Sequence, residues 1–337
     1  MKNNLTEKDI ENLNKWAEKY DIEELKIKDK EKIFNLEELH ISNDNLTELP
    51  KEIGILTNLK ILDIVCFKLN ELPKEIFNLI NLKELNINSV SLTELPKEIG
   101  NLTNLKSLII RCFNLKELPK EIFNLINLEE LYIRNNNLTE LPKEIGNLIN
   151  LEELHIISTS LTELPKEIGI LTNLKILDIE CYNLKELPKE IFNLINLEEL
   201  YIRNNNLTEL PKEIGNLTNL KSLHISSNNL TKLPKEIFNL INLEELHIIS
   251  VSLTELPKEI GNLTNLKSLD IDCYLNELPK EIYNLINLEK LSIIINNLEI
   301  SPDGIEKPIN FKSLPIEEIG KLNNLKDLSI RIRKEEK

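Results

Sequence analysis

A Leu-Pro dipeptide returns at one fixed interval along most of this chain. Ten successive copies of its proline are spaced by 23 residues; the next follows after 22 residues and the last after 36. These prolines are Pro50, Pro73, Pro96, Pro119, Pro142, Pro165, Pro188, Pro211, Pro234, Pro257, Pro279 and Pro315. Self-similarity at such a period is the signature of a solenoid. The sequence therefore predicts a repeat array rather than the two or three globular domains that 337 residues would otherwise suggest.

Each repeat has the pattern of a short strand followed by a tight turn. In one copy Leu128, Leu131 and Ile133 are the first apolar positions, and the last two have the two-residue period of a strand. Pro142 suits the first position of a short helix or 3₁₀ turn, because the N–H that it lacks would be unsatisfied there anyway. Ile145 then returns to the same core. One repeat cannot bury its apolar side alone, so the pattern requires stacked neighbours.

The repeat reads Leu-x-x-Leu-x-Ile-x-x-Asn-x-Leu-x-x-Leu-Pro-x-x-Ile-x-x-Leu, and it resembles the repeat of leucine-rich repeat proteins. Its 23-residue Leu-Pro-x-x-Ile form looks most like the Ras-group and bacterial members, over roughly residues 22–330. The resemblance implies an α/β fold, a leucine-rich repeat solenoid (horseshoe) with a parallel concave β-sheet and short helices or 3₁₀ turns on the convex side. Since family members share this shape and not one partner, it implies much about the fold and little about function.

The array divides into four segments. We expect residues 1–35 to form an N-terminal helical cap, 36–298 the tandem repeats, 299–313 an insertion loop, and 314–337 the last repeat with a charged tail. In the cap, Thr6 and Asp9 have the spacing of a helix capping box. The apolar face of that helix would cover the open end of the first repeat, and it contains Ile10, Leu13, Trp16, Ala17 and Tyr20. At the other end, either the insertion folds over the last repeat or a partner covers it.

Two positions of the repeat vary in an informative way. The residue after the turn isoleucine is glycine or an aromatic residue in most repeats, and we expect large and small side chains to interdigitate there on the convex side. The ninth position carries asparagine in family members, which implies that its amide bonds to the backbone of the bend after the strand. Asparagine stands there in only some repeats, so the expected ladder is interrupted. The asparagines are Asn136, Asn205, Asn228 and Asn296, with Asp44 as a near match.

The charge balance excludes whole classes of ligand. The chain has 41 basic residues against 56 acidic ones, a net charge of −15. Nucleic-acid backbones and anionic membrane surfaces require clustered positive charge, so neither kind of partner is expected.

Location is predicted from the thiols and from the apolar runs. No secretory signal pattern is visible near the first residue, and no apolar run has the length of a membrane-spanning helix. The cysteines share one repeat position in different repeats, beyond disulfide reach, which predicts reduced thiols. We expect a cytoplasmic protein, with export by a route that uses no signal peptide as the alternative. The usage of Ile, Asn, Lys and Glu is typical of an AT-rich bacterial genome. The cysteines are Cys66, Cys112, Cys181 and Cys273.

The candidate functional surface is the face of the sheet that the inward residues leave exposed. Side chains at the fifth and seventh positions point onto the concave face, in rows about 4.8 Å apart from strand to strand. They include Tyr, His and Arg, the types that protein interfaces enrich at their energetic centres. We therefore predict a non-enzymatic protein–protein interaction scaffold whose concave face binds a protein partner, with the partner and the oligomeric state left open. The predicted binding residues are Tyr132, Arg134, His155, Asp178, Tyr201, Arg203, His224, His247 and Asp270.

Two alternative functions remain open. One, from known uses of the family, is a bacterial effector or surface-associated factor that binds host proteins. The other is a metal-dependent or thiol enzyme, because His224, His247 and Asp270 fall on consecutive strands and are ligand types for Zn²⁺. Common descent of the repeats explains that cluster more simply. No Ser-His-Asp, Cys-His or phosphate-binding glycine pattern can be assembled, so we assign no catalytic, cofactor-binding or metal-binding residue and expect no enzyme activity.

Overall fold

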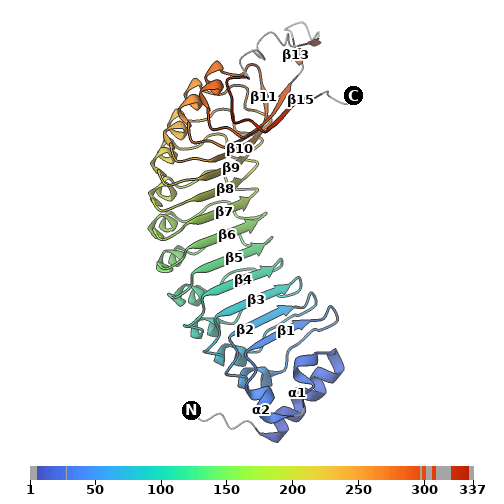
Figure 1. The fold of residues 1–337 in the computed structure, drawn as a ribbon. Helices are drawn as coiled ribbons and strands as arrows, with labels where there is room; N and C mark the ends of the chain where they lie inside the picture. The colour runs from blue at the N-terminus through green and yellow to red at the C-terminus, as the bar shows by residue number, and fades with distance from the viewer. Residues whose placement is uncertain (1–5, 28, 297, 301–305, 309–319, 334–337) are drawn as a thin grey trace. The chain divides into compact units, whose positions relative to one another are not determined.

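The computed structural model describes residues 6–27, 29–296, 298–300, 306–308 and 320–333. The chain forms two compact units, Met1–Leu174 and Lys175–Lys337, and each is described by itself. In both units a layer of parallel strands lies on one side and a column of short 3₁₀ turns on the other (Figure 1). The predicted solenoid of parallel strands and short turns is therefore confirmed.

The first unit opens with α1 (Glu7–Tyr20), the 3₁₀ turn η1 (Glu23–Leu25) and α2 (Lys30–Phe34). Each strand of its sheet pairs in parallel with the next along the chain, and each pairing advances by one repeat, as between Leu39 and Leu62. Its strands are β1 (Glu38–Ser42), β2 (Ile61–Val65), β3 (Glu84–Ser89), β4 (Ser107–Cys112), β5 (Glu130–Asn135) and β6 (Glu153–Ser158). Its further turns are η2 (Lys51–Ile55), η3 (Lys74–Asn78), η4 (Lys97–Asn101), η5 (Lys120–Asn124), η6 (Lys143–Asn147) and η7 (Lys166–Ile170).

The second unit continues the same alternation. Its parallel strands are β7 (Ile176–Cys181), β8 (Glu199–Arg203), β9 (Ser222–Ser226), β10 (Glu245–Ser250), β11 (Ser268–Leu275), β12 (Lys290–Asn296) and β15 (Asp327–Arg333). Its turns are η8 (Lys189–Asn193), η9 (Lys212–Asn216), η10 (Lys235–Asn239), η11 (Lys258–Asn262) and η12 (Lys280–Asn284). A short antiparallel pair, β13 (Leu298–Ile300) with β14 (Glu306–Pro308), lies within the predicted insertion. The rest of that insertion, 301–305 and 309–313, falls outside the described residues.

The core of each repeat is built from the predicted leucines and isoleucines. Leu131, Ile133 and Ile145 are all at most 1% exposed. The proline has a slightly different place from the expected one: Pro142 precedes η6 instead of opening it, with φ −58° and ψ 140°. Its carbonyl accepts the N–H of Ile145 at 3.1 Å, which closes the turn. The ring therefore holds the extended residue that enters the turn, where its missing N–H leaves no backbone group unpaired.

Glycine stands in the turns where the following turn approaches most closely. A Cβ added to Gly215 in η9 would lie 2.7 Å from the backbone oxygen of Glu236 in η10. The aromatic residue that follows in η10, Phe238, is fully buried. The glycine therefore leaves room for the backbone of the next turn; that large and small side chains interdigitate there stays a prediction. The glycine is required because its missing side chain lets the next backbone come near.

Replacing Gly215 by alanine should lower the free energy of unfolding by about 1–3 kcal/mol, because the backbone of Glu236 must move to admit a methyl group. Urea denaturation followed by circular dichroism measures this. Gly146→Ala is the matched control with a milder contact and should cost less, since its added Cβ would lie 3.2 Å from the carbonyl oxygen of Glu167 instead of 2.7 Å. Equal losses in the two variants would contradict the close approach.

The inward polar position after each strand is the eighth of the repeat, not the ninth as predicted. Asn135 is buried, and its amide donates to the carbonyls of Cys112 at 2.6 Å and Leu115 at 2.8 Å in the preceding repeat. The side-chain oxygen of Asn135 accepts hydrogen bonds from the backbone N–H groups of Asn137 and Leu138. Asn136, the predicted residue, is exposed. The strand continues its alternation for one residue more than expected, which turns position eight inward.

Serine or cysteine holds the eighth position in eight of the other repeats, at residues 66, 89, 112, 158, 181, 227, 250 and 273. Ser89 donates to the carbonyl of Leu69 at 2.9 Å and accepts the N–H of Ser91 at 3.2 Å. The Cys112 thiol lies 3.8 Å from the carbonyl oxygen of Ile87, and the Cys273 thiol lies 3.7 Å from that of Ile248. Both carbonyls belong to the preceding repeat. None of the four cysteines, all of which are described, forms a disulfide. Burial raises the pKa of Cys112 and of Cys273 to about 12, so neither thiol is a nucleophile near neutral pH.

Asn204→Ala should cost about 2–4 kcal/mol of unfolding free energy, since it strips partners from the carbonyls of Cys181 and Leu184 and from the N–H of Leu207. Chemical denaturation again provides the measurement. The adjacent Asn205→Ala, on an exposed side chain, should change stability by less than about 0.5 kcal/mol. If Asn205 proved the more costly of the two, the ninth position would be the structural one after all.

A second asparagine ladder lies just before the strands, and sequence analysis missed it. In the first unit Asn104 donates to the carbonyl of Ile80 at 2.9 Å, and in the second Asn242 donates to that of Thr218 at 2.8 Å. The signal was present in the Leu-Thr-Asn-Leu and Leu-Ile-Asn-Leu segments, which carry this asparagine in every repeat. Each bond joins one repeat to the preceding one, so the ladder pairs backbone carbonyls that the turn leaves open.

The short repeat extends its strand instead of bending. In β11 the burial alternates through Cys273 to Leu275, and the pairing with β12 shifts between Asp272 and Leu275. In an ordinary repeat the next inward leucine stands three positions after position eight, as Leu138 does after Asn135, whereas here Leu275 stands two positions after Cys273. A spacing of two keeps both side chains on one face of a strand, so no bend is needed.

The helical cap begins with the predicted capping box. The Thr6 hydroxyl accepts the N–H of Asp9 at 3.2 Å, and the Asp9 carboxylate accepts that of Thr6 at 2.9 Å. Ile10, Leu13 and Ala17 are buried. The side-chain amide of Asn12 donates to the carboxylate of Glu52 in η2 at 3.0 Å, which links α1 to the first turn of the array.

Candidate functional site

The strand residues that alternate with the buried ones form what we call the exposed sheet face: positions three, five and seven of each repeat. Eight of the nine predicted binding residues are half-buried there, and Arg134 is exposed. Tyr132, Arg134 and His155 lie in the first unit. Asp178, Tyr201, Arg203, His224, His247 and Asp270 lie in the second, on consecutive strands β7 to β11. The exposed sheet face is therefore described unit by unit.

In the second unit the fifth positions form a continuous row. The rings of Tyr201 and His224 are 6.2 Å apart between centroids, and those of His224 and His247 are 4.2 Å apart. His247 Nε2 lies 3.5 Å from a carboxylate oxygen of Asp270. The pairing of β8 to β11 places these residues directly opposite one another. Strand register thus brings together side chains that lie whole repeats apart in the sequence.

Arg203 is held by carboxylates of the neighbouring strand. One guanidinium nitrogen lies 3.2 Å from Asp178 and 3.2 Å from Glu180. The Asp178 side chain is only 13% exposed, so these pairs are shielded from solvent more than ordinary surface pairs. The guanidinium also lies 5.6 Å from the ring centre of Tyr201, whose hydroxyl donates to Glu199 at 2.7 Å. Burial, followed by this carboxylate, raises the pKa of Tyr201 to about 12.

The histidine in the middle of the row stays neutral over a wide pH range. Burial lowers the pKa of His224 to about 4, and His247 and Arg203 add repulsion to the charged form. The ring therefore presents a neutral aromatic surface at pH 7. Its folded pKa lies below the value of about 6.5 that an unfolded chain would show.

We expect His224 to lower the free energy of unfolding as the pH falls from about 6.5 toward 4, because His224 is then protonated in the unfolded chain but still neutral in the folded protein. The difference in unfolding free energy between the wild type and His224→Gln should therefore be flat above pH 7 and grow in favour of the variant below 6.5. Denaturation of both proteins across this range measures it. An NMR titration that placed the His224 pKa at or above 6.5 would contradict the expectation.

In the first unit two arginines stack on aromatic rings. The guanidinium of Arg111 lies 4.6 Å from the ring centre of Tyr132, and that of Arg134 lies 5.4 Å from the ring centre of Phe113. Tyr132 also lies 5.6 Å from the ring of His155. Arg111 and Phe113 were not among the predicted binding residues, although Arg111 occupies the same seventh position as Arg134.

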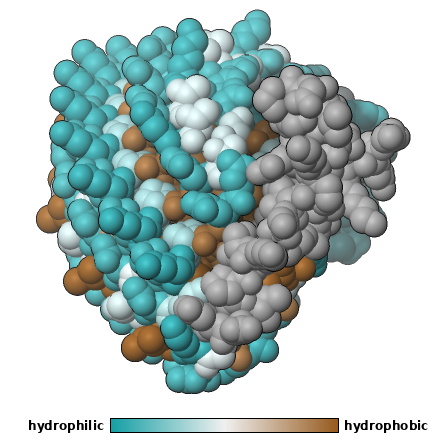
Figure 2. Space-filling view, turned by 90° about the horizontal axis from the view of Figure 1, so that it is seen from above, coloured by the Kyte–Doolittle hydropathy of each residue, from teal (hydrophilic) through white to brown (hydrophobic). Residues whose placement is uncertain are grey.

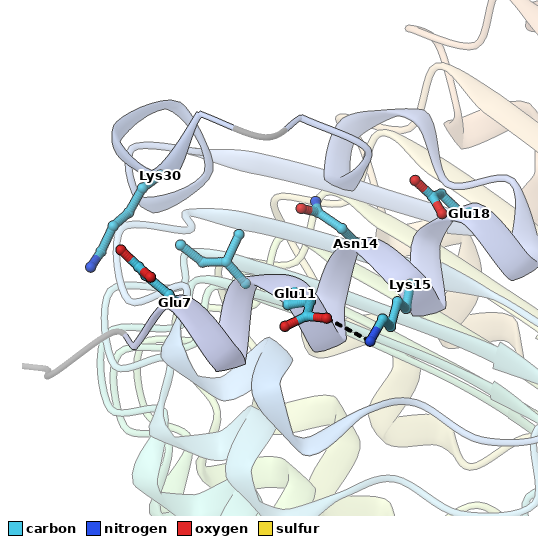
Figure 3. A pocket seen from close by; sticks show the side chains of 7 residues that line it. Glu7, Glu11, Asn14, Lys15, Glu18 and Lys30 are labelled. Carbon is cyan, nitrogen blue, oxygen red and sulfur yellow. Dashed lines mark ion pairs between the residues drawn. The ribbon is translucent and has the colours of Figure 1, made fainter.

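Three hollows lie among the described residues, and two of them are small. One of about 210 Å³ lies among β2, β3 and β4 beside Asp63 and Asn86, and one of about 170 Å³ lies beside Glu199 and Tyr201. Pockets for drug-sized ligands usually measure about 300–1,000 Å³. A wider hollow of about 490 Å³ beside α1 is lined by surface charges, including the Glu11–Lys15 ion pair at 2.6 Å (Figure 3). Its lining also includes the buried Ile10 and the half-buried Asn14, whose amide donates to the carbonyl of Ile27 at 3.1 Å.

The visible face in Figure 2 is mainly hydrophilic, with hydrophobic residues in small groups. Exposed isoleucines do occur just before the strands of the second unit, where Ile195, Ile241 and Ile286 are 56–58% exposed. Threonine holds the same position in the repeats between them, at Thr218 and Thr264. This alternation breaks the row into separate apolar spots rather than one large patch.

Within the described residues no three His, Cys, Asp or Glu side chains are grouped to hold a metal ion, and His224, His247 and Asp270 do not form such a group. None of the described helices is long and apolar enough to cross a membrane.

Comparison with known proteins places the sequence with one family. It matches the family described as leucine-rich repeat region over residues 74–182, 154–228 and 212–337. No curated protein matched by sequence. A leucine-rich repeat protein of Leptospira interrogans is 33% identical, with 91% of this chain and 88% of that one covered and a TM-score of 0.63.

Two further solved structures are similar. A plant peptide hormone receptor, solved in complex with the peptide RGF2, is 28% identical with a TM-score of 0.62; the match covers 89% of this chain and half of the receptor's chain. An internalin of Listeria monocytogenes is 19% identical with a TM-score of 0.66, and the match covers 98% and 95% of the two chains. At that identity the internalin shows the common fold alone.

Proposed function

Because the chain belongs to the leucine-rich repeat family, we propose that it is a non-enzymatic scaffold that binds a protein partner on the exposed sheet face. Proteins of this fold are typically interaction modules. The buried thiols, with the pKa of Cys112 and Cys273 raised to about 12, also argue against a thiol enzyme.

The observation that carries the proposal is the prearranged row of the second unit. Arg203 and Tyr201 are each fixed by carboxylates of their own sheet, and Tyr201 continues into the stacked rings of His224 and His247. Side chains that are ordered before binding lose less conformational entropy when a partner arrives. Tyrosine and arginine are also enriched among the residues that dominate binding energy.

The turn side of the array lacks these features. Its most regular element is a Lys-Glu pair at the start of nearly every turn, including Lys143-Glu144 and Lys212-Glu213. Lys143 and Lys212 are exposed. Uniform, mobile charge supports solubility and offers little to distinguish one partner from another.

The plant receptor supports a polypeptide ligand, since its structure contains a bound peptide. The Leptospira protein supports a bacterial origin for this chain and keeps a bacterial effector or surface-associated factor as the second candidate. We propose a cytoplasmic location from the unbridged cysteines, with export by a signal-independent route as the alternative. Fractionation of the native cell and its medium, with an antibody to the chain, separates these locations.

Once a partner has been isolated from the native cell by affinity purification and cross-linking, Tyr201→Ala combined with Arg203→Ala should weaken its binding by at least about 2 kcal/mol. Isothermal titration calorimetry measures the change. Lys143→Glu combined with Lys212→Glu is the control on the turn side and should alter Kd by less than about twofold. A larger effect from the lysine changes would move the binding surface to the turn side.

A further inference from the structure

One long segment of this chain occurs twice with the same sequence. Residues 114–148 and 183–217 are identical, and they include β5 with Tyr132 and Arg134, and β8 with Tyr201 and Arg203. The strands just before them differ: β4 reads Ser-Leu-Ile-Ile-Arg-Cys, and β7 reads Ile-Leu-Asp-Ile-Glu-Cys. Any difference between the two arginines in their surroundings on that side therefore comes from the preceding strand.

The preceding strand of the second unit neutralises its arginine. Asp178 and Glu180 on β7 stand opposite Tyr201 and Arg203 on β8, and both carboxylates pair with the guanidinium at 3.2 Å. The guanidinium of Arg203 is therefore already paired within its own sheet, and an anionic ligand would have to displace two ion pairs to bind it.

The preceding strand of the first unit does the opposite. Ile109 and Arg111 on β4 occupy the positions of the two carboxylates, and Arg111 stands directly opposite Arg134. On the next strand in each direction, Asn88 of β3 stands opposite Arg111 and Ile157 of β6 stands opposite Arg134, and neither residue is charged. Within the described residues neither arginine has an ion pair with a carboxylate; their contacts are the rings of Tyr132 and Phe113.

Two like charges directly opposite in a sheet destabilise it. The chain carries this pair despite an excess of acidic residues, a net charge of −15, from which a counter-ion could easily have come. The stacked rings orient both planar guanidinium groups, and no described residue accepts a hydrogen bond from their N–H groups. Such groups bind carboxylates through two parallel hydrogen bonds. The two guanidinium groups are therefore oriented to bind an anion from a ligand.

We propose that Arg111 and Arg134, braced by Tyr132 and Phe113, bind the carboxylates of an acidic segment of the protein partner. This deepens the proposed function and rests on it. An Asp- or Glu-bearing peptide fits better than a polyanion, because Glu130 and Glu153 at the third positions of β5 and β6 limit the positive patch to the two arginines. A nucleic-acid strand would meet those carboxylates as well.

The test uses the full chain and a fluorescein-labelled peptide of sequence Gly-Glu-Glu-Gly-Glu-Glu-Gly, titrated at low ionic strength by fluorescence anisotropy. Wild type should bind it, and the matched peptide with Gln for Glu should bind at least about tenfold more weakly. Arg111→Glu recreates the Glu180–Arg203 arrangement, so it should weaken peptide binding at least about tenfold. Lys143→Glu makes the same charge change on the turn side of the same unit, so it is the matched control and should change binding by less than about twofold.

Thermal melting separates loss of the site from loss of the fold. Arg111→Glu replaces a like-charge pair by an opposite-charge pair, so its Tm should equal or exceed that of wild type while peptide binding falls. Binding that is unchanged in Arg111→Glu, or equal for the Glu and Gln peptides, overturns the proposal. Binding of a phosphoserine peptide without binding of the Glu peptide also overturns it, because the ligand would then be a phosphate.

The isolated partner distinguishes this inference from the proposed function. If Tyr201→Ala with Arg203→Ala weakens the partner while Arg111→Glu does not, the exposed sheet face is the binding surface and the arginine pair is not its acidic subsite. If partner binding is insensitive to all three changes, both the proposed function and the inference that the arginine pair binds the partner's acidic segment are wrong, even where the acidic peptide itself depends on Arg111.

Discussion

The structure depends on pairing the backbone groups of each repeat with its neighbour. At the bend after the strand, a buried Asn, Ser or Cys reaches the carbonyls of the preceding repeat, as Asn135 does. Before the strand, a second asparagine does the same, as Asn104 shows. Since no repeat can pair these groups or bury its leucines alone, stability within each unit is shared between neighbours. A repeat is therefore constrained along its inward positions and in its turn.

This constraint leaves the exposed sheet face free to vary. The inward positions of residues 114–148 and 183–217 are identical and support the same local structure, yet the outward residues of the strands before them differ. In one case Asp178 and Glu180 neutralise the arginine, and in the other Arg111 adds a second positive charge. Duplication of a repeat thus supplies the scaffold, and changes at a few outward positions supply the chemistry.

Close packing on the turn side follows from the same need for near neighbours. The backbone of one turn approaches the next so closely that a methyl group on Gly215 would meet a carbonyl oxygen, and the buried ring of Phe238 stands in the following turn. Only glycine, phenylalanine and tyrosine stand at this position of the turns. The outward positions of the strands therefore vary more from repeat to repeat than the turn residues do.

The sequence by itself determined the solenoid, the strand and turn of each repeat, the buried leucines and the capping box of α1, because period and local spacing express them directly. It also located the rows that include Tyr201 and His224. Tertiary structure decided that position eight rather than nine turns inward, because one further residue of strand alternation depends on pairing with the next repeat. It also decided which arginine is neutralised. Arg134 and Arg203 have identical sequence surroundings from residue 114 or 183 onward, and only the strand paired beside each one sets its charge partner.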